Sequence, residues 1–160
     1  MPESPMNLDA FSTVVSRDVS SDYFDGQQTR PLNAEEVDWI NKGIKAAQWL
    51  LVHYQISADG GGSLQMLDDV LDRWRADRSP ERPDGEFVST AIGCLFGYCF
   101  VQELGGVFVV VTDKHGVDLG VETAPGEIGF PIDSVLKRLD RADATLSELL
   151  ATIRKHHDSL

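Results

Sequence analysis

The spacing of apolar residues changes its period several times in the second half of the chain. Residues 87–104 are apolar on nearly every side, which predicts a helix buried all round at the centre of the fold. Gly105 and Gly106 end this helix, and residues 107–111 form a β-branched and aromatic run without a polar face. We expect this run to be an interior strand, buried on both faces, with residues 11–15 as the best candidate for its second neighbour.

A half-exposed strand is predicted to return from this run. Residues 113–116 form the turn, with Gly116 at the position that needs a positive φ. Beyond the turn the sequence alternates, with Val117, Leu119 and Val121 expected inward and Asp118, Gly120 and Glu122 outward. A third short strand over 128–130 leads to a helix that begins with Pro131.

The first half of the chain predicts two helices. Asn33 and Glu36 have the spacing of a capping box, and an apolar stripe follows them at intervals of three and four residues. The stripe consists of Val37, Ile40, Ile44, Ala47, Leu51 and Tyr54. Trp49 falls about 170° from the centre of this stripe, so it is either covered by the N-terminal residues, which we favour, or offered to a partner. The second helix carries Leu64, Leu67, Leu71 and Trp74 at the same spacing.

Runs of helices followed by antiparallel strands and further helices are typical of the α+β class. We therefore predict helices packed on a small antiparallel sheet of three to four strands. The 160 residues suit one globular domain over 31–160, preceded by a partly ordered arm over 1–30. Gly93 and Gly97 lie one turn apart in the central helix and predict a notch where another element packs closely.

The net charge of −12 is distributed unevenly. Residues 81–130 contain eight acidic and two basic side chains and so carry −6, whereas residues 131–160 contain five of each and are neutral. A surface of this sign repels nucleic acid and anionic membranes, so we expect neither as a partner. It would attract a basic protein, although acidity can also serve only to keep a protein soluble.

Other features of the chain bear on its compartment. We expect a cytoplasmic protein, because the N-terminal residues do not resemble a signal peptide and no apolar run approaches the roughly 18 residues needed to cross a bilayer. Cys94 and Cys99 diverge by about 140° on the central helix. Two buried thiols of low reactivity are therefore expected, as in a reducing compartment.

Candidate chemistry is sparse. Asp118 and Glu122 share one side of a strand but lie about 13 Å apart, beyond the roughly 5–9.5 Å that paired glycosidase carboxylates need. The four histidines lack the spacing of a zinc helix, and the Gly-rich segment before residue 63 lacks the strand and the Lys-Ser or Lys-Thr pair of a phosphate loop. We therefore expect no catalytic residue, cofactor or metal site, and lean against an enzyme.

Several of these features together resemble a family. The apolar helix, the strand with Asp113 and Gly116 in a D-x-x-G turn, and Phe130-Pro131 before Lys137-Arg138 are similar to an uncharacterised bacterial domain of unknown function. The resemblance covers the C-terminal half and implies the fold. It implies no activity.

These observations favour a small protein-binding module. The expected docking surface consists of Asp113, His115, Asp118, Glu122, Glu127 and Trp49. In its most specific form the hypothesis is an immunity protein or inhibitor that neutralises a basic toxin domain. The alternatives are an enzyme or small-ligand-binding protein with an unidentified site, and an accessory subunit of a larger assembly; the sequence leaves the oligomeric state open.

Overall fold

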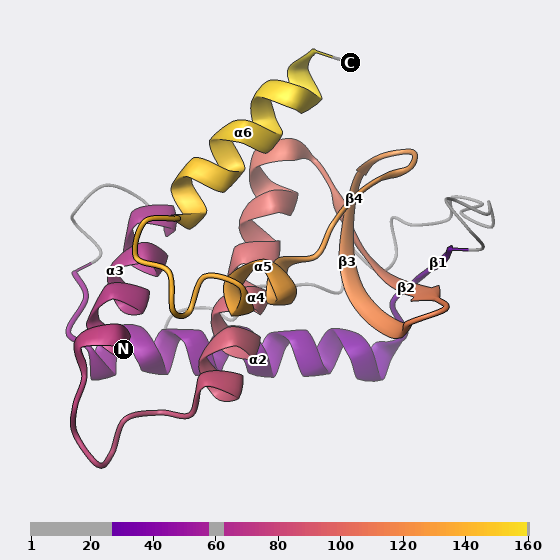
Figure 1. Cartoon of the computed structure of the whole chain (residues 1–160). Coiled ribbons are helices and arrows are strands. Elements are labelled where there is room, and N and C mark those ends of the chain that lie inside the picture. The colour runs from indigo at the N-terminus through magenta and orange to yellow at the C-terminus, as the bar shows by residue number, and fades with distance from the viewer. Residues whose placement is uncertain (1–26, 58–62, 160) are drawn as a thin grey trace.

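The computed structural model describes residues 27–57 and 63–159 and places a group of helices beside one sheet (Figure 1). In chain order the elements are β1 (Gln28–Pro31), α2 (Ala34–His53), α3 (Ser63–Ala76), α4 (Gly85–Leu104), β2 (Val107–Asp113), β3 (Gly116–Ala124), β4 (Glu127–Gly129), α5 (Pro131–Leu136) and α6 (Leu146–Asp158). The strands form a four-stranded antiparallel sheet in the order β1-β2-β3-β4. The predicted α+β class is confirmed.

The strand β2 is an interior strand, as expected. It pairs with β3 on one side and with β1 on the other, in a register that sets Gln28 opposite Thr112 and Pro31 opposite Val109. The second neighbour is therefore Gln28–Pro31, of which residues 28–30 belong to the expected arm, and not residues 11–15, which lie outside the described residues. A Pro at the end of an edge strand is tolerated, because that position need not donate to the ladder.

Both faces of β2 are buried, and the two faces belong to different clusters. Phe108 and Val110 pack into the main core, whereas Val107, Val109 and Val111 form a second cluster with Ile128 and Phe130. Successive side chains of a strand point to opposite faces, so one apolar run supplies both clusters. The absence of a polar face in residues 107–111 thus predicted the position of the strand correctly.

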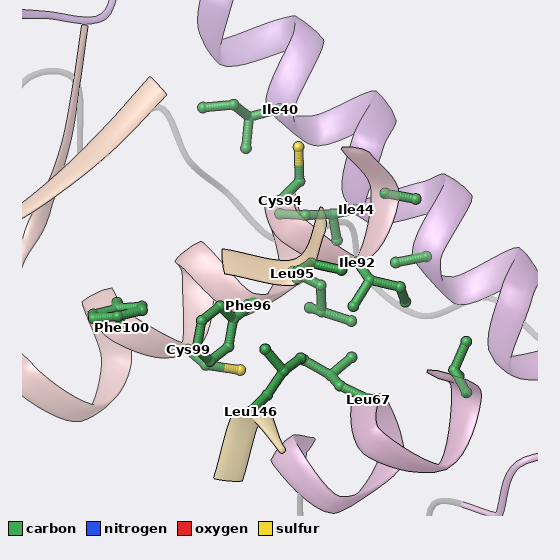
Figure 2. Close-up of a cluster of buried hydrophobic side chains, with 14 of the residues drawn as sticks. Ile40, Ile44, Leu67, Ile92, Cys94, Leu95, Phe96, Cys99, Phe100 and Leu146 are labelled. Atoms are coloured by element: carbon green, nitrogen blue, oxygen red, sulfur yellow. The ribbon is translucent and has the colours of Figure 1, made fainter. Parts of the chain in front are cut away.

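The helix α4 is the central element. It contacts α2, α3, α5, α6 and the sheet, and thirteen of its 20 residues are buried (Figures 1 and 2). Within the described residues it is the one helix long and apolar enough to cross a membrane, with a mean hydropathy of 1.4, which corrects our expectation that no segment approaches this limit. Because 72% of the apolar window is buried inside the fold, its composition is explained as that of a core helix.

Glycines let neighbouring elements approach α4 closely. A Cβ at Gly93 would lie 2.6 Å from Ile132 of α5, and one at Gly97 would lie 2.7 Å from the ring of Phe108 in β2. The predicted packing notch is therefore confirmed. It holds α5 and the sheet against the central helix, and so determines where α5 stands beside β3.

The helix α2 begins at the predicted capping box. The Asn33 side chain accepts from the Glu36 amide at 2.8 Å, and the Glu36 carboxylate accepts from the Asn33 amide at 2.9 Å. The buried stripe matches the prediction except near its end, where Leu50 is buried and Leu51 only partly so. This stripe packs on α4, and on the other side of α2 the side chains of Trp39 and Trp49 are about half exposed.

Candidate functional site

The burial of β3 residues depends on their position along the strand more than on the face of the sheet to which they point. At the turn end Val117 is 68% exposed and Asp118 is exposed, whereas Val121 and Glu122 are buried together. The reason is the length of the neighbours: β2 accompanies β3 throughout, but β4 pairs with it only from Val121 onward. The expectation that β3 has one buried and one exposed face along its whole length is therefore wrong.

Glu122 is buried and so cannot belong to the expected docking surface. Glu122 lies opposite Val107 of β2 and Ile128 of β4, and it is only 1% exposed. Where a strand has a paired neighbour on each side, side chains of the neighbouring strands can cover its residues on either face of the sheet. The alternation of β3 predicted its orientation and could not predict this cover.

Glu127 is also engaged within the protein. Its Oε1 accepts a hydrogen bond from the Thr123 hydroxyl and lies 2.8 Å from Nδ1 of His157, near the end of α6. Burial raises the pKa of Glu127, but the hydrogen bonds from Thr123 and His157 and the charges of His157 and His156 outweigh it, so that the pKa is below its ordinary value. This carboxylate anchors α6 to β4 and is a poor candidate for contact with a partner.

Three carboxylates do gather at the turn end of the sheet, and we call them the acidic rim: Asp113, Asp118 and Asp133. Asp118 is exposed as a residue, but partial burial of its carboxylate, followed by the negative charges of Asp133 and Asp113, raises its pKa. Asp113 holds the turn by accepting a hydrogen bond from the His115 amide at 2.7 Å, and His115 itself is exposed. Asp133 belongs to the first turn of α5 and was not predicted as a site residue.

The acidic rim borders an apolar groove, the sheet groove, with a volume of about 290 Å³. Its walls are the first half of α2, the middle of β2, the start of β3, and α5. It is lined by Leu32, Glu36, Trp39, Ile40, Val110, Val117, Asp118, Leu119 and Ile132. The carboxylate of Glu36 is bound to the Arg30 guanidinium at 2.7 and 2.8 Å, so Asp118 is the lining carboxylate without a cation among the described ion pairs.

Trp39 is the site residue that sequence reasoning missed. It is 48% exposed and lies about 110° from the centre of the buried stripe of α2. The criterion that singled out Trp49, a large aromatic away from the apolar stripe, would have found it. An exposed tryptophan beside an apolar groove is a typical anchor of a protein interface.

Trp49 lies elsewhere on α2. It is 49% exposed, stacks on His53 with ring centroids 4.7 Å apart, and meets the edge of Phe87 of α4 at 6.0 Å. The N-terminal residues that we expect to cover it lie outside the described part of the chain. Trp49 is separate from the acidic rim, so the structure does not unite all six predicted residues in one patch.

The contacts of Glu127 invite comparison with a catalytic triad. In such a triad the imidazole stands between hydroxyl and carboxylate and takes the hydroxyl proton. Here both Thr123 and His157 bind to the carboxylate, so the imidazole does not stand between the two groups and cannot take the hydroxyl proton. The arrangement stabilises the β4 turn and does not activate a nucleophile.

The remaining reactive groups are enclosed. Burial raises the pKa of Cys94 to about 12 and that of Cys99 to about 11, so both thiols stay protonated at neutral pH. Within residues 27–57 and 63–159, no three His, Cys, Asp or Glu side chains are grouped so as to hold a metal ion.

Comparisons of the chain with protein-family models, with curated proteins and with solved structures gave no match.

Proposed function

We propose that the protein is a small acidic binding module that docks a basic protein partner in the sheet groove. The observation that carries the proposal is the acidic rim beside an apolar groove walled by the exposed Trp39. Apolar area supplies affinity in a protein interface, and charge at its border guides the approach and selects the partner.

The charge of the rim favours a cationic partner. Asp118 has no cation among the ion pairs of the described residues, and Asp133 meets only Lys137, in an exposed i,i+4 pair at 2.9 Å. Such exposed pairs contribute little, about 0.3–0.5 kcal/mol. Burial is the main cause of the raised pKa of Asp118, and repulsion by Asp133 and Asp113 adds to it; a partner that brings Lys or Arg beside an apolar side chain would counter both by pairing with the carboxylate.

The most specific form of the proposal is an immunity protein or inhibitor of a basic toxin domain. Such a module needs a rigid surface more than a reactive group. The sheet groove meets this requirement, because two strands and two helices that contact α4 form its walls. The sign of the rim argues against nucleic acid and anionic membranes as partners.

The test is charge reversal of the acidic rim. The triple variant Asp113→Lys, Asp118→Lys and Asp133→Lys changes the net charge by +6, from −12 to −6. Affinity capture from the native host identifies a candidate partner, and stopped-flow mixing with the purified partner measures the association rate at low and high salt. We expect slow association for the variant and a wild-type rate that falls as salt rises.

The matched control is Glu81→Lys, Asp140→Lys and Asp158→Lys, which makes the same change of net charge at exposed positions outside the groove. It should associate at nearly the wild-type rate. If the two triple variants slow association equally, only the total charge matters and the sheet groove is not the docking site.

A further inference from the structure

The sheet groove does not end at Trp39. A second groove, the helix groove, runs between α2 and the start of α4, has a volume of about 510 Å³, and shares Trp39 as a wall. It is lined by Trp39, Lys42, Gly43, Ala46, Asp84, Glu86, Phe87, Thr90 and Ala91. The two grooves therefore lie on either side of one half-exposed tryptophan and form a continuous strip across α2.

Aromatic side chains extend the strip beyond the helix groove. Phe87 is 41% exposed at the start of α4, and its ring meets Trp49 of α2 at 6.0 Å. Trp39 and Trp49 are ten residues apart, which is about 15 Å along a helix. Three large aromatics, each 41–49% exposed, thus lie along the strip, and exposed apolar surface gathered in this way marks an interaction site.

Negative charge borders both ends of the strip. The acidic rim lies at the sheet end, and Asp84 and Glu86 lie at the other, where none of the ion pairs of the described residues includes them. The one cation of the helix groove, Lys42, is bound to Asp38 at 2.9 Å. The strip is therefore apolar along its length and acidic at its borders.

We infer that the strip binds an amphipathic basic helix of the partner, an inference that rests on the proposed function. A helix of about 10–14 residues would span the 15 Å between the two tryptophans. Its apolar face would fill the grooves beside Trp39 and reach Phe87, as helices do in grooves between other helices. Its lysines or arginines would face the carboxylates at either end.

The probe is a synthetic leucine–lysine peptide of about 14 residues with its leucines at helical spacing. The controls are a peptide of the same composition with its leucines spread around the helix, and a leucine–glutamate analogue. Binding is measured by titration calorimetry and by the fluorescence of Trp39 and Trp49, which are half-exposed, whereas Trp74 is buried. We expect a blue shift with the first peptide, about tenfold weaker binding of the second, and none of the third.

Variants at the far end of the strip separate this inference from the proposed function. Phe87→Ala and Glu86→Lys should each weaken the leucine–lysine peptide about tenfold, as loss of an interface anchor does. Val52→Ala removes another exposed apolar side chain of α2 that lines neither groove, and it should bind as the wild type does. Circular dichroism checks that each variant is folded.

The outcomes decide between the two claims. If Phe87→Ala and Glu86→Lys bind as the wild type while the acidic-rim variant loses binding, the partner uses the sheet groove alone and the helix inference is wrong. If none of these variants changes the affinity, the proposed function fails as well. If sedimentation shows a dimer that Phe87→Ala dissociates, the strip is a contact between copies of this chain, which also overturns the inference.

Discussion

The carboxylate of Asp68 in α3 accepts a hydrogen bond from the backbone amide of Leu146, 78 residues later, at 2.7 Å. It also accepts from the amide and hydroxyl of Ser147, at 3.2 and 2.6 Å. Asp68 is 7% exposed, so a buried negative charge stands at the N-terminus of α6, where the helix dipole is positive. One acidic residue thus joins two helices that the sequence separates widely.

Replacing Asp68 should destabilise the protein strongly. Asp68→Ala leaves the amides at the start of α6 without their acceptor, and we expect a loss of about 2–4 kcal/mol in the free energy of unfolding. Urea denaturation followed by circular dichroism measures it. The neighbouring Asp69, which accepts from the Gln65 side chain at the surface, provides the control: Asp69→Ala should cost no more than about 0.5 kcal/mol. Equal losses would contradict the capping role.

Gly43 should not tolerate a side chain. A Cβ there would lie 2.5 Å from the sulfur of Cys94, which points from α4 toward α2 (Figure 2). Alanine in place of glycine ordinarily stabilises a helix by about 0.5–1 kcal/mol, but overpacking costs about 1–3 kcal/mol. We expect Gly43→Ala to be destabilising in urea denaturation, and the double variant Gly43→Ala with Cys94→Ala to show a favourable coupling energy. Strict additivity would show that the two positions do not meet.

The two thiols should be inert in the folded protein. With pKa values of about 12 for Cys94 and about 11 for Cys99, the nucleophilic thiolate is nearly absent at pH 8, and both side chains are buried. We expect no reaction with a disulfide reagent such as DTNB in buffer and release of two equivalents after unfolding in guanidinium. Rapid labelling of one thiol in buffer would show that α4 opens locally.

The hydrophobic pattern predicts the fold well because the residues of most helices and strands indicate by themselves how deeply the element is buried. Residues 107–111 indicate an interior strand by lacking a polar face, and Gly93 and Gly97 indicate a close contact by lacking side chains. The partner of β2 was harder to predict. The segment Gln28–Pro31 is short, polar and ends in proline, so nothing in its own composition marks it as a strand.

The candidate site was only partly predictable, because its acidic residues have similar sequence surroundings and differ only in which tertiary neighbours bury them. Asp118 and Glu122 have the same place in the alternating pattern of β3. However, β4 pairs with the strand at Glu122 and does not reach Asp118, so only Glu122 is buried. Glu127 appears free in the sequence until α6 brings His157 beside it. Asp133 joins the acidic rim through the placement of α5, which depends on packing at Gly93.

Asp118 should limit stability at neutral pH. Its pKa is raised in the folded state, so the folded protein disfavours its charged form. The cost is absent below the ordinary aspartate pKa of about 4, grows as the pH rises through the folded-state pKa, and is complete at pH 7. Asp118→Asn is neutral throughout, and we expect it to be more stable than the wild type at pH 7, by up to about 0.5 kcal/mol because the side chain is exposed.

The same substitution should weaken binding of the leucine–lysine peptide, which would give Asp118 the signature of a functional residue that costs stability. Urea denaturation at pH 7 and pH 3 measures the first effect, and the stability difference should vanish at the lower pH. Asp140→Asn, at an exposed position outside the acidic rim, should change neither stability nor binding appreciably. A wild-type protein that is more stable than Asp118→Asn at pH 7 would mean that Asp118 is held by a favourable contact. The acidic rim would then be a structural feature and not a surface kept for a partner.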